Sequence, residues 1–268
     1  MSSSDVEVQG DDENTANERY VNVKNELVRR AQKMSLPVKR LLALAIAKTD
    51  SRQKILLHKA KMKDPESGEM AGWSVKITAA EYAEHYPQVG EDAAYSELKT
   101  SASALMKCTI NMIERTMQRG KVVEQPIEVP FTNKNIYPKG QGHVIIRFSG
   151  EIAPFLLALE GAFTQYKLSS AAHLRSMYSW RLLELLAQFQ KTTGVCVIGY
   201  DEFCDALDVP ASCRKDFAQL RRRVIEPAVA ELKAKNGIDV EWEGTKPGGR
   251  KITGLRFTFT PSKQGSLF

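Results

Sequence analysis

Basic and amide side chains concentrate in one short stretch of this 268-residue chain, residues 213–223. Those that could contact a phosphate or a base edge are Arg214, Lys215, Gln219, Arg221, Arg222 and Arg223. Arginine can bind guanine through two hydrogen bonds, and glutamine can bind adenine in the same way. The chemistry that these residue types predict is therefore recognition of duplex DNA.

The apolar residues of this stretch recur at helical spacing. If Phe217, Leu220 and Val224 form the buried stripe, a step of about 100° per residue defines an opposite polar face. That face holds Lys215, Gln219, Arg222 and Arg223, with Arg221 at its margin. Base contacts are expected from Gln219, Arg222 and Arg223, and phosphate contacts from Arg214, Lys215 and Arg221. A solvated basic face that pairs with acids such as Glu226 is the alternative, and Pro227 predicts a kink or restart in the helix.

A glycine-rich basic turn between two alternating segments follows this helix. Apolar and polar residues alternate through residues 238–243 and again through residues 255–259, which is typical of strands with one buried face. The turn carries Lys246, Arg250 and Lys251, and its glycines allow the backbone to approach phosphate closely. This order predicts a recognition helix followed by a β-wing.

A strand-then-helix pattern occurs twice in the chain. Residues 77–86 align with residues 198–207, and Tyr82 is paired with Phe203. Each copy is followed by a break and a second helix, which is expected at residues 94–107 in the first copy. Helix, turn and helix form a common DNA-binding unit. The recurrence predicts an α+β fold with two tandem winged-helix domains related by internal duplication.

The first copy is less basic than the second. Its second helix has a Ser/Thr/Lys face, and strands are predicted at residues 109–115, 122–130 and 143–148 around basic turns. Contacts with the DNA backbone are expected from Lys99, Lys107, Arg115, Arg119 and Lys121. An ordinary helix packed on strands is the alternative.

The start of the chain combines an acidic segment with two predicted helices. Ser35 and Pro37 predict the beginning of a helix that ends near Lys48, and residues 25–34 are expected to form a short helix before it. The predicted divisions are an acidic disordered tail over residues 1–22, a first winged-helix domain over 23–150, a second over 151–262 and a tail over 263–268.

The composition is that of an ordinary soluble globular protein, with 43% hydrophobic residues. The net charge of +6 understates the basic character of the body, because acidic residues gather in the first 26 residues. That acidic start has no apolar run, so it is neither a signal peptide nor a membrane span. A cytoplasmic location is expected, and the role of the tail is open.

Cysteine and histidine spacing argues against a metal site. Cys108, Cys196, Cys204 and Cys213 lack CxxC spacing and are expected to be reduced thiols. The four histidines are scattered singly, and neither a P-loop nor a GxGxxG motif is present. No catalytic, metal-binding or cofactor-binding residue is therefore predicted.

The order of the segments resembles the iteron-binding plasmid replication initiators. The segments that carry the resemblance are residues 25–46, 163–168, 177–186 and 221–232. Within them Arg181 could pair with Glu184 or Glu202. The resemblance implies a non-enzymatic initiator that binds direct repeats at an origin as a monomer and represses its own promoter, at an inverted repeat, as a dimer. It also implies recruitment of the host replication initiator and replicative helicase, with the second domain as the stronger base reader and the first contributing dimerisation.

Two other functions are weighed against initiation. A transcriptional repressor without initiator activity would use the same two domains, because DNA binding is common to both. A rolling-circle nicking enzyme is less favoured, since it needs a metal-binding histidine pair beside a nucleophilic tyrosine.

Overall fold

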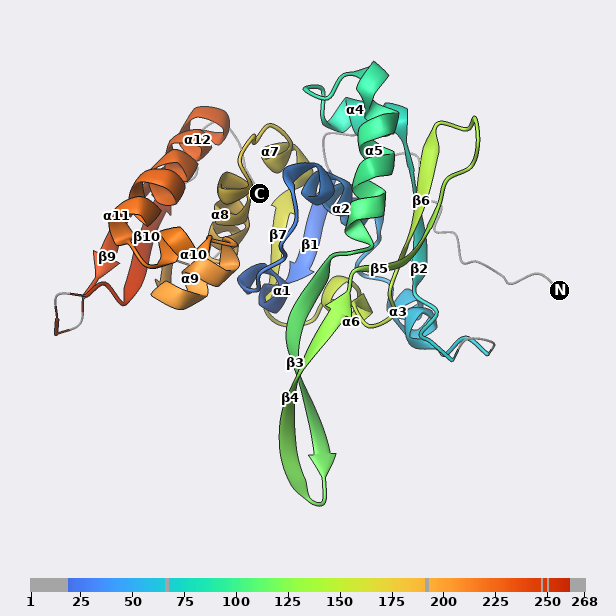
Figure 1. The fold of residues 1–268 in the computed structure, drawn as a ribbon, viewed down its shortest axis with the longest axis horizontal. Helices are drawn as coiled ribbons and strands as arrows, with labels where there is room; N and C mark the ends of the chain where they lie inside the picture. Colours follow the sequence, from blue (N-terminus) through green and yellow to red (C-terminus); the bar gives the residue numbers. More distant parts are fainter. Residues whose placement is uncertain (1–18, 66–67, 191–192, 247, 250, 261–268) are drawn as a thin grey trace.

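Two winged-helix units lie side by side with a small β-ribbon between them (Figure 1). The computed structural model describes residues 19–65, 68–190, 193–246, 248–249 and 251–260. The acidic residues 1–18, Arg250 of the wing turn and the predicted tail 263–268 lie outside this described part. Within it, no helix is both long enough and apolar enough to cross a membrane.

The first unit is built on a three-stranded antiparallel sheet. Its helices are α2 (Leu36–Lys48), α4 (Ala79–His85) and α5 (Glu91–Leu105). Its strands run in the order β2 (Trp73–Thr78), β6 (His143–Phe148) and β5 (Thr132–Ile136). Helix α2 follows Ser35 and has proline in its first turn, as predicted. Two short helices, α3 (Lys54–Lys61) and α6 (Ala153–Leu156), were not predicted.

The second unit repeats this arrangement. Its helices are α8 (Met177–Ala187), α9 (Tyr200–Ala206), α10 (Ala211–Arg214), α11 (Phe217–Leu220) and α12 (Glu226–Asn236). Its strands run in the order β8 (Val195–Gly199), β10 (Gly254–Thr260) and β9 (Asp239–Thr245). In both units the strand before the helix-turn-helix is an edge strand, and the last strand of the unit is central. The predicted duplication and the predicted wing hairpin are confirmed.

The duplication extends to the helix that opens each unit. Helix α2 packs on α5, and α8 packs on α12. Residues 40–42 of α2 and residues 181–183 of α8 share the sequence Arg-Leu-Leu. This short match lies outside residues 77–86 and 198–207, from which the duplication was predicted. It lies in the opening helix of each unit.

A long ribbon has no counterpart in the second unit. Strands β3 (Thr109–Gln118) and β4 (Lys121–Pro130) are inserted between α5 and β5 and project from the body (Figure 1). Arg119 and Gly120 form its two-residue tip with φ of 51° and 75°. Positive φ at both positions is the conformation that matches the right-handed twist of a hairpin.

A central joint ties the start of the chain to the segment between the units. Strand β1 (Tyr20–Lys24) pairs antiparallel with β7 (Phe163–Lys167), and the short helices α1 (Asn25–Arg29) and α7 (Leu168–Ala172) follow them. Residues 20–22, which the predicted divisions placed in the acidic tail, are thus part of a strand.

The helix predicted over residues 25–34 ends early, at Arg29. Arg30 adopts an extended conformation, with φ of −100° and ψ of 149°. From there on, long-range partners replace the hydrogen bonds of a helix. Asp208 accepts hydrogen bonds from the backbone N–H groups of Gln32 and Lys33. Tertiary contacts therefore override the local helical pattern.

A buried carboxylate connects the joint to both units. Glu184 of α8 lies 2.7 Å from Nζ of Lys39 in α2 and 2.8 Å from Nη1 of Arg181, and it accepts a 2.8 Å hydrogen bond from the hydroxyl of Tyr166 in β7. Burial alone would raise the pKa of Glu184, but the two cations outweigh it and hold the pKa of this carboxyl below its ordinary value. The predicted pairing of Arg181 is therefore with Glu184.

Replacing Glu184 with glutamine removes the charge that compensates two buried cations. We expect Glu184→Gln to lower the free energy of unfolding by about 3–5 kcal/mol, measured by urea unfolding at neutral pH. The difference in the free energy of unfolding between the wild type and Glu184→Gln declines as the pH falls below the ordinary pKa range of glutamate, because the pKa of Glu184 in the folded state is lowered.

The half-exposed pair between Arg29 and Glu202, 2.7 Å apart, provides the matched control. Glu202→Gln is expected to cost only about 0–1 kcal/mol, since solvent screens that pair. Equal losses in the two variants would contradict the importance of the buried carboxylate.

Candidate nucleic-acid interface

The helix-turn-helix of the second unit is held together by Arg214. Its Nε donates to the carbonyl oxygen of Val209 (2.7 Å), Nη1 to the carboxylate of Asp205 (2.6 Å) and Nη2 to the carbonyl oxygen of Cys204 (3.0 Å). The guanidinium is thus directed back at α9 and the turn that follows it. Arg214 was expected at a phosphate, and the structure shows it fixing the position of the following helix.

The recognition helix is interrupted near its start. The helical spacing predicted no break before Pro227, but α10 ends at Arg214 and a new helix begins at Phe217. Asp216 caps this second start, because its carboxylate accepts hydrogen bonds from the N–H groups of Ala218 (2.8 Å) and Gln219 (3.3 Å). Lys215 lies in the break and is exposed.

A π-helical segment, η2 (Arg221–Ile225), contains the arginine triplet. The N–H of Glu226 donates to the carbonyl of Arg221, five residues earlier. Pro227 comes next; it has no N–H, and in an α-helix its ring would clash with the carbonyl of Arg223. The wider π turn relieves this conflict. The restart predicted at Pro227 is therefore confirmed, because the α-helix α12 begins at Glu226 and has this proline in its first turn.

The three arginines are exposed but differ in their partners. Arg221 forms a 2.6 Å ion pair with Glu226, and Nη2 of Arg222 donates to Gln219 (3.2 Å). Within the described part of the chain, no hydrogen bond or ion pair restrains the Arg223 side chain. Leu220 is buried as expected. The alternative of an acid-paired basic face thus applies to Arg221, whereas Arg222 and Arg223 remain available to a ligand.

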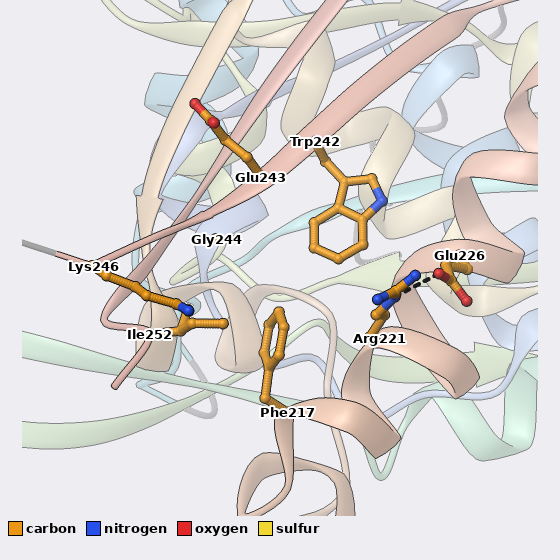
Figure 2. A pocket seen from close by; sticks show the side chains of 8 residues that line it. All are labelled: Phe217, Arg221, Glu226, Trp242, Glu243, Gly244, Lys246 and Ile252. Atoms are coloured by element: carbon orange, nitrogen blue, oxygen red, sulfur yellow. Dashed lines mark hydrogen bonds and ion pairs between the residues drawn. The ribbon is translucent and has the colours of Figure 1, made fainter. Parts of the chain in front are cut away.

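A groove separates this helix from the wing (Figure 2). Its volume is about 450 Å³, and it is lined by Phe217, Arg221, Glu226, Trp242, Glu243, Gly244, Lys246 and Ile252. The rings of Phe217 and Trp242 meet edge to face with centroids 6.2 Å apart. Because Phe217 lines the groove, it is half-buried instead of fully buried. Lys246 and Arg221 stand on two sides of the groove (Figure 2), and Lys251 is exposed on the turn.

The predicted contacts of the first unit do not form one cluster. Lys99 and Lys107 are exposed, the former on α5 with its ammonium 5.9 Å from the ring centroid of Tyr137 and the latter just after α5. The others lie on the inserted ribbon, where Arg115 is paired with Glu124 at 2.7 Å. Arg119 and Lys121 are at its exposed tip.

A basic residue on the true wing of the first unit was missed. Residues 137–142 connect β5 to β6, the counterparts of β9 and β10, and this turn carries the exposed Lys139. Its Pro-Lys-Gly sequence resembles the Lys-Pro-Gly sequence of the second wing turn. Aligning these two turns would have separated the wing from the inserted ribbon.

Two family models together match most of the chain. The model described as "Initiator Replication protein, WH1" matches residues 20–187, and that described as "Initiator Rep protein, WH2" matches residues 200–259. The first match includes α8, which in the structure is the opening helix of the second copy.

Individual relatives agree with this assignment. The chain is 26% identical over 267 residues to the PI protein of Escherichia coli, with 88% of this chain and 81% of that protein covered. It is 31% identical over 101 residues to a probable replication protein rep of Bifidobacterium longum, with 38% of this chain and 33% of that protein covered. The crystal structure of the Pi initiator protein in complex with iteron DNA has the same fold, with a TM-score of 0.69, 22% identity, and 92% of this chain and 99% of that chain covered. The chain therefore belongs to the initiator replication protein family, whose members combine a WH1 and a WH2 domain.

Proposed function

We propose that this protein is a plasmid replication initiator that binds repeated duplex sites, the iterons, through both winged-helix units. The observation that carries the proposal is the exposure of Arg222 and Arg223 on the recognition helix of a duplicated winged-helix fold. Membership of the initiator family supports it, as does the similar fold of the Pi initiator protein, whose structure contains iteron DNA. The proposed role involves no covalent chemistry.

The second unit is the main reader of bases in this proposal. Gln219, Arg222 and Arg223 approach base edges in the major groove, where they can form paired hydrogen bonds. The contacts proposed for phosphates are Lys215, Arg221, Lys246, Arg250 and Lys251. Arg214 acts indirectly, by holding the recognition helix against α9.

The first unit contributes backbone contacts. Lys99 and Lys107 lie on and directly after α5, the counterpart of the recognition helix, and Lys139 lies on the counterpart of the wing turn. Arg115, Arg119 and Lys121 would reach phosphates from the inserted ribbon. We place the division between the domains within residues 149–176, between the last strand of the first copy and the first helix of the second.

Self-association is assigned to the inserted ribbon of the first unit. Met117 and Val122 are paired across the two strands, and both point to the same face as Ile113. Their exposed fractions are 69%, 63% and 49%. In a single chain these apolar side chains are therefore uncovered, and the Arg115–Glu124 ion pair lies on the same face between Ile113 and the pair at the tip. The proposal includes dimers that repress the gene's own promoter, and recruitment of the host initiator and the replicative helicase.

Footprinting the DNA that flanks its own coding sequence tests the proposed function. A ladder of evenly spaced direct repeats is expected, since an initiator occupies several sites in register. One inverted repeat over a promoter, without direct repeats, would replace this proposal with the repressor.

The salt dependence of binding to a footprinted repeat is expected to be steep. Several lysine and arginine side chains displace counterions from phosphates, so the logarithm of the affinity should fall by several units per tenfold increase in salt. Fluorescence anisotropy with a labelled duplex between about 50 and 200 mM salt measures it. A flat response would exclude the proposed phosphate contacts.

Arg223→Ala separates base reading from phosphate contact. We expect it to cost about 1–3 kcal/mol on the cognate repeat and to relax the preference at one base position. Lys215→Ala is the comparison, because it should weaken binding to all duplexes alike and reduce the salt slope by about one unit. Equal losses for Arg223→Ala on every sequence would reassign this arginine to phosphate.

A further inference from the structure

Arg181 links the segment before the first unit to the second unit through backbone carbonyls. Its side chain is fully buried, and Nη2 donates to the carbonyl oxygens of Val28 (2.7 Å) and Arg30 (2.8 Å). Its Nε donates to the carbonyl oxygen of Ala206 at the end of α9 (2.7 Å). One guanidinium thus holds the segment before the first unit against the helix-turn-helix of the second.

Asp208 makes the same connection from the other side. It lies in the turn between α9 and α10 with φ of +52°, a conformation in which aspartate and asparagine are enriched. Its carboxylate accepts hydrogen bonds from the N–H of Gln32 (3.0 and 3.1 Å) and of Lys33 (3.1 Å). These hydrogen bonds of Asp208, called the clamp below, therefore lie directly before the recognition helix.

The connection continues into the first unit. Gln32 is buried, and its side chain donates to the carbonyl oxygen of Leu27 (3.1 Å) and accepts from Nζ of Lys39 in α2 (3.0 Å). Lys39 is paired in turn with Glu184. Since α2 packs on α5, a continuous set of buried and part-buried contacts runs from the turn before the recognition helix of the second unit to α5 of the first.

The equivalent arginine of the first copy has a different role. Arg40 in α2 corresponds to Arg181 in α8, yet its guanidinium faces partners of its own unit. It lies 3.7 Å from Glu97 and 5.7 Å from the ring centroid of Tyr86. The contacts of Arg181 with the segment before the first unit are therefore not a requirement of the winged-helix fold itself.

We infer that Arg181 and Asp208 are positioning residues that fix the separation and twist between the two DNA-reading helices. This inference rests on the proposed function. Once one unit has bound the duplex, binding of the other unit is an intramolecular event. When the two DNA-reading helices are held rigidly, this second event is favoured only if the major groove lies where the second helix is held. One base pair turns the duplex by about 34°, so a rigid protein must discriminate between spacings.

Asp208→Asn tests this with little structural cost, because asparagine tolerates the same backbone conformation. Its amide offers one acceptor oxygen in place of two, so the clamp weakens. Asp201→Asn is the matched control, since Asp201 is exposed on α9, the helix that precedes Asp208, and the change in net charge is identical. Arg181→Lys provides a second variant, and each protein's unfolding midpoint is recorded so that loss of fold is recognised.

The first measurement is binding to duplexes that carry one footprinted repeat with the spacer between its two protected segments changed by one or two base pairs. Wild type and Asp201→Asn are expected to lose at least about tenfold in affinity on the altered spacers. Asp208→Asn should lose affinity on the natural repeat but discriminate less between spacings. A spacing preference equal to that of wild type, in both Asp208→Asn and Arg181→Lys, would overturn the inference.

The second measurement requires no DNA. Spin labels at the exposed positions Glu84 in α4 and Ala234 in α12, in a Cys108→Ser background, report the distance between the units. Asp208→Asn should broaden this distance distribution, whereas Asp201→Asn should not. An unchanged distribution would contradict the positioning role even if DNA binding is confirmed. Absence of any repeat binding by wild type would count against the proposed function alone.

Discussion

Glu184 lies between two cations from different copies of one fold, Lys39 of α2 and Arg181 of α8. A buried charge is costly unless it is paired and hydrogen-bonded, so the three side chains require one another. Tyr166 completes the coordination of the carboxylate. The strand pair of the joint, the two opening helices and the extended segment after Arg29 are all arranged around this cluster.

The interface for DNA follows from what this joint leaves exposed. Each unit buries its opening helix against the helix that occupies the recognition position, and the opposite face of that helix is free. In the second unit the free face carries an arginine triplet on a π turn. In the first unit it carries the single lysine Lys99, and an inserted ribbon adds exposed apolar side chains. Duplication thus supplied two similar scaffolds with different surfaces.

Much of the fold could be predicted because it depends on local patterns. The alternation over residues 238–243 predicted a strand with one buried face, and the wing hairpin confirms it. The repeat at residues 77–86 and 198–207 predicted a strand followed by a helix in each copy, which the structure also confirms. The early end of the helix at Arg29 and the break at Asp216 could not be predicted, since long-range contacts in one case and a local cap in the other outweigh helical periodicity.

The candidate site was predictable in type but only partly in geometry. Exposure of Arg222 and Arg223 follows from helical spacing. The inward orientation of Arg214 and the pairing of Arg221 with Glu226 depend on neighbours that periodicity does not reveal. The sequence pattern did not distinguish the inserted ribbon of the first unit from its wing. The correspondence of β5 and β6 with β9 and β10 appears only in the order of the strands in the two sheets.

Hydroxyl-radical footprinting of a single repeat tests the central claim most directly, namely that both winged-helix units bind one duplex together. Two protected patches on the same face of the DNA, about one helical turn apart, are predicted for the full chain. A single patch the width of one recognition helix would contradict the account, because it would show that only one of the two units binds the repeat.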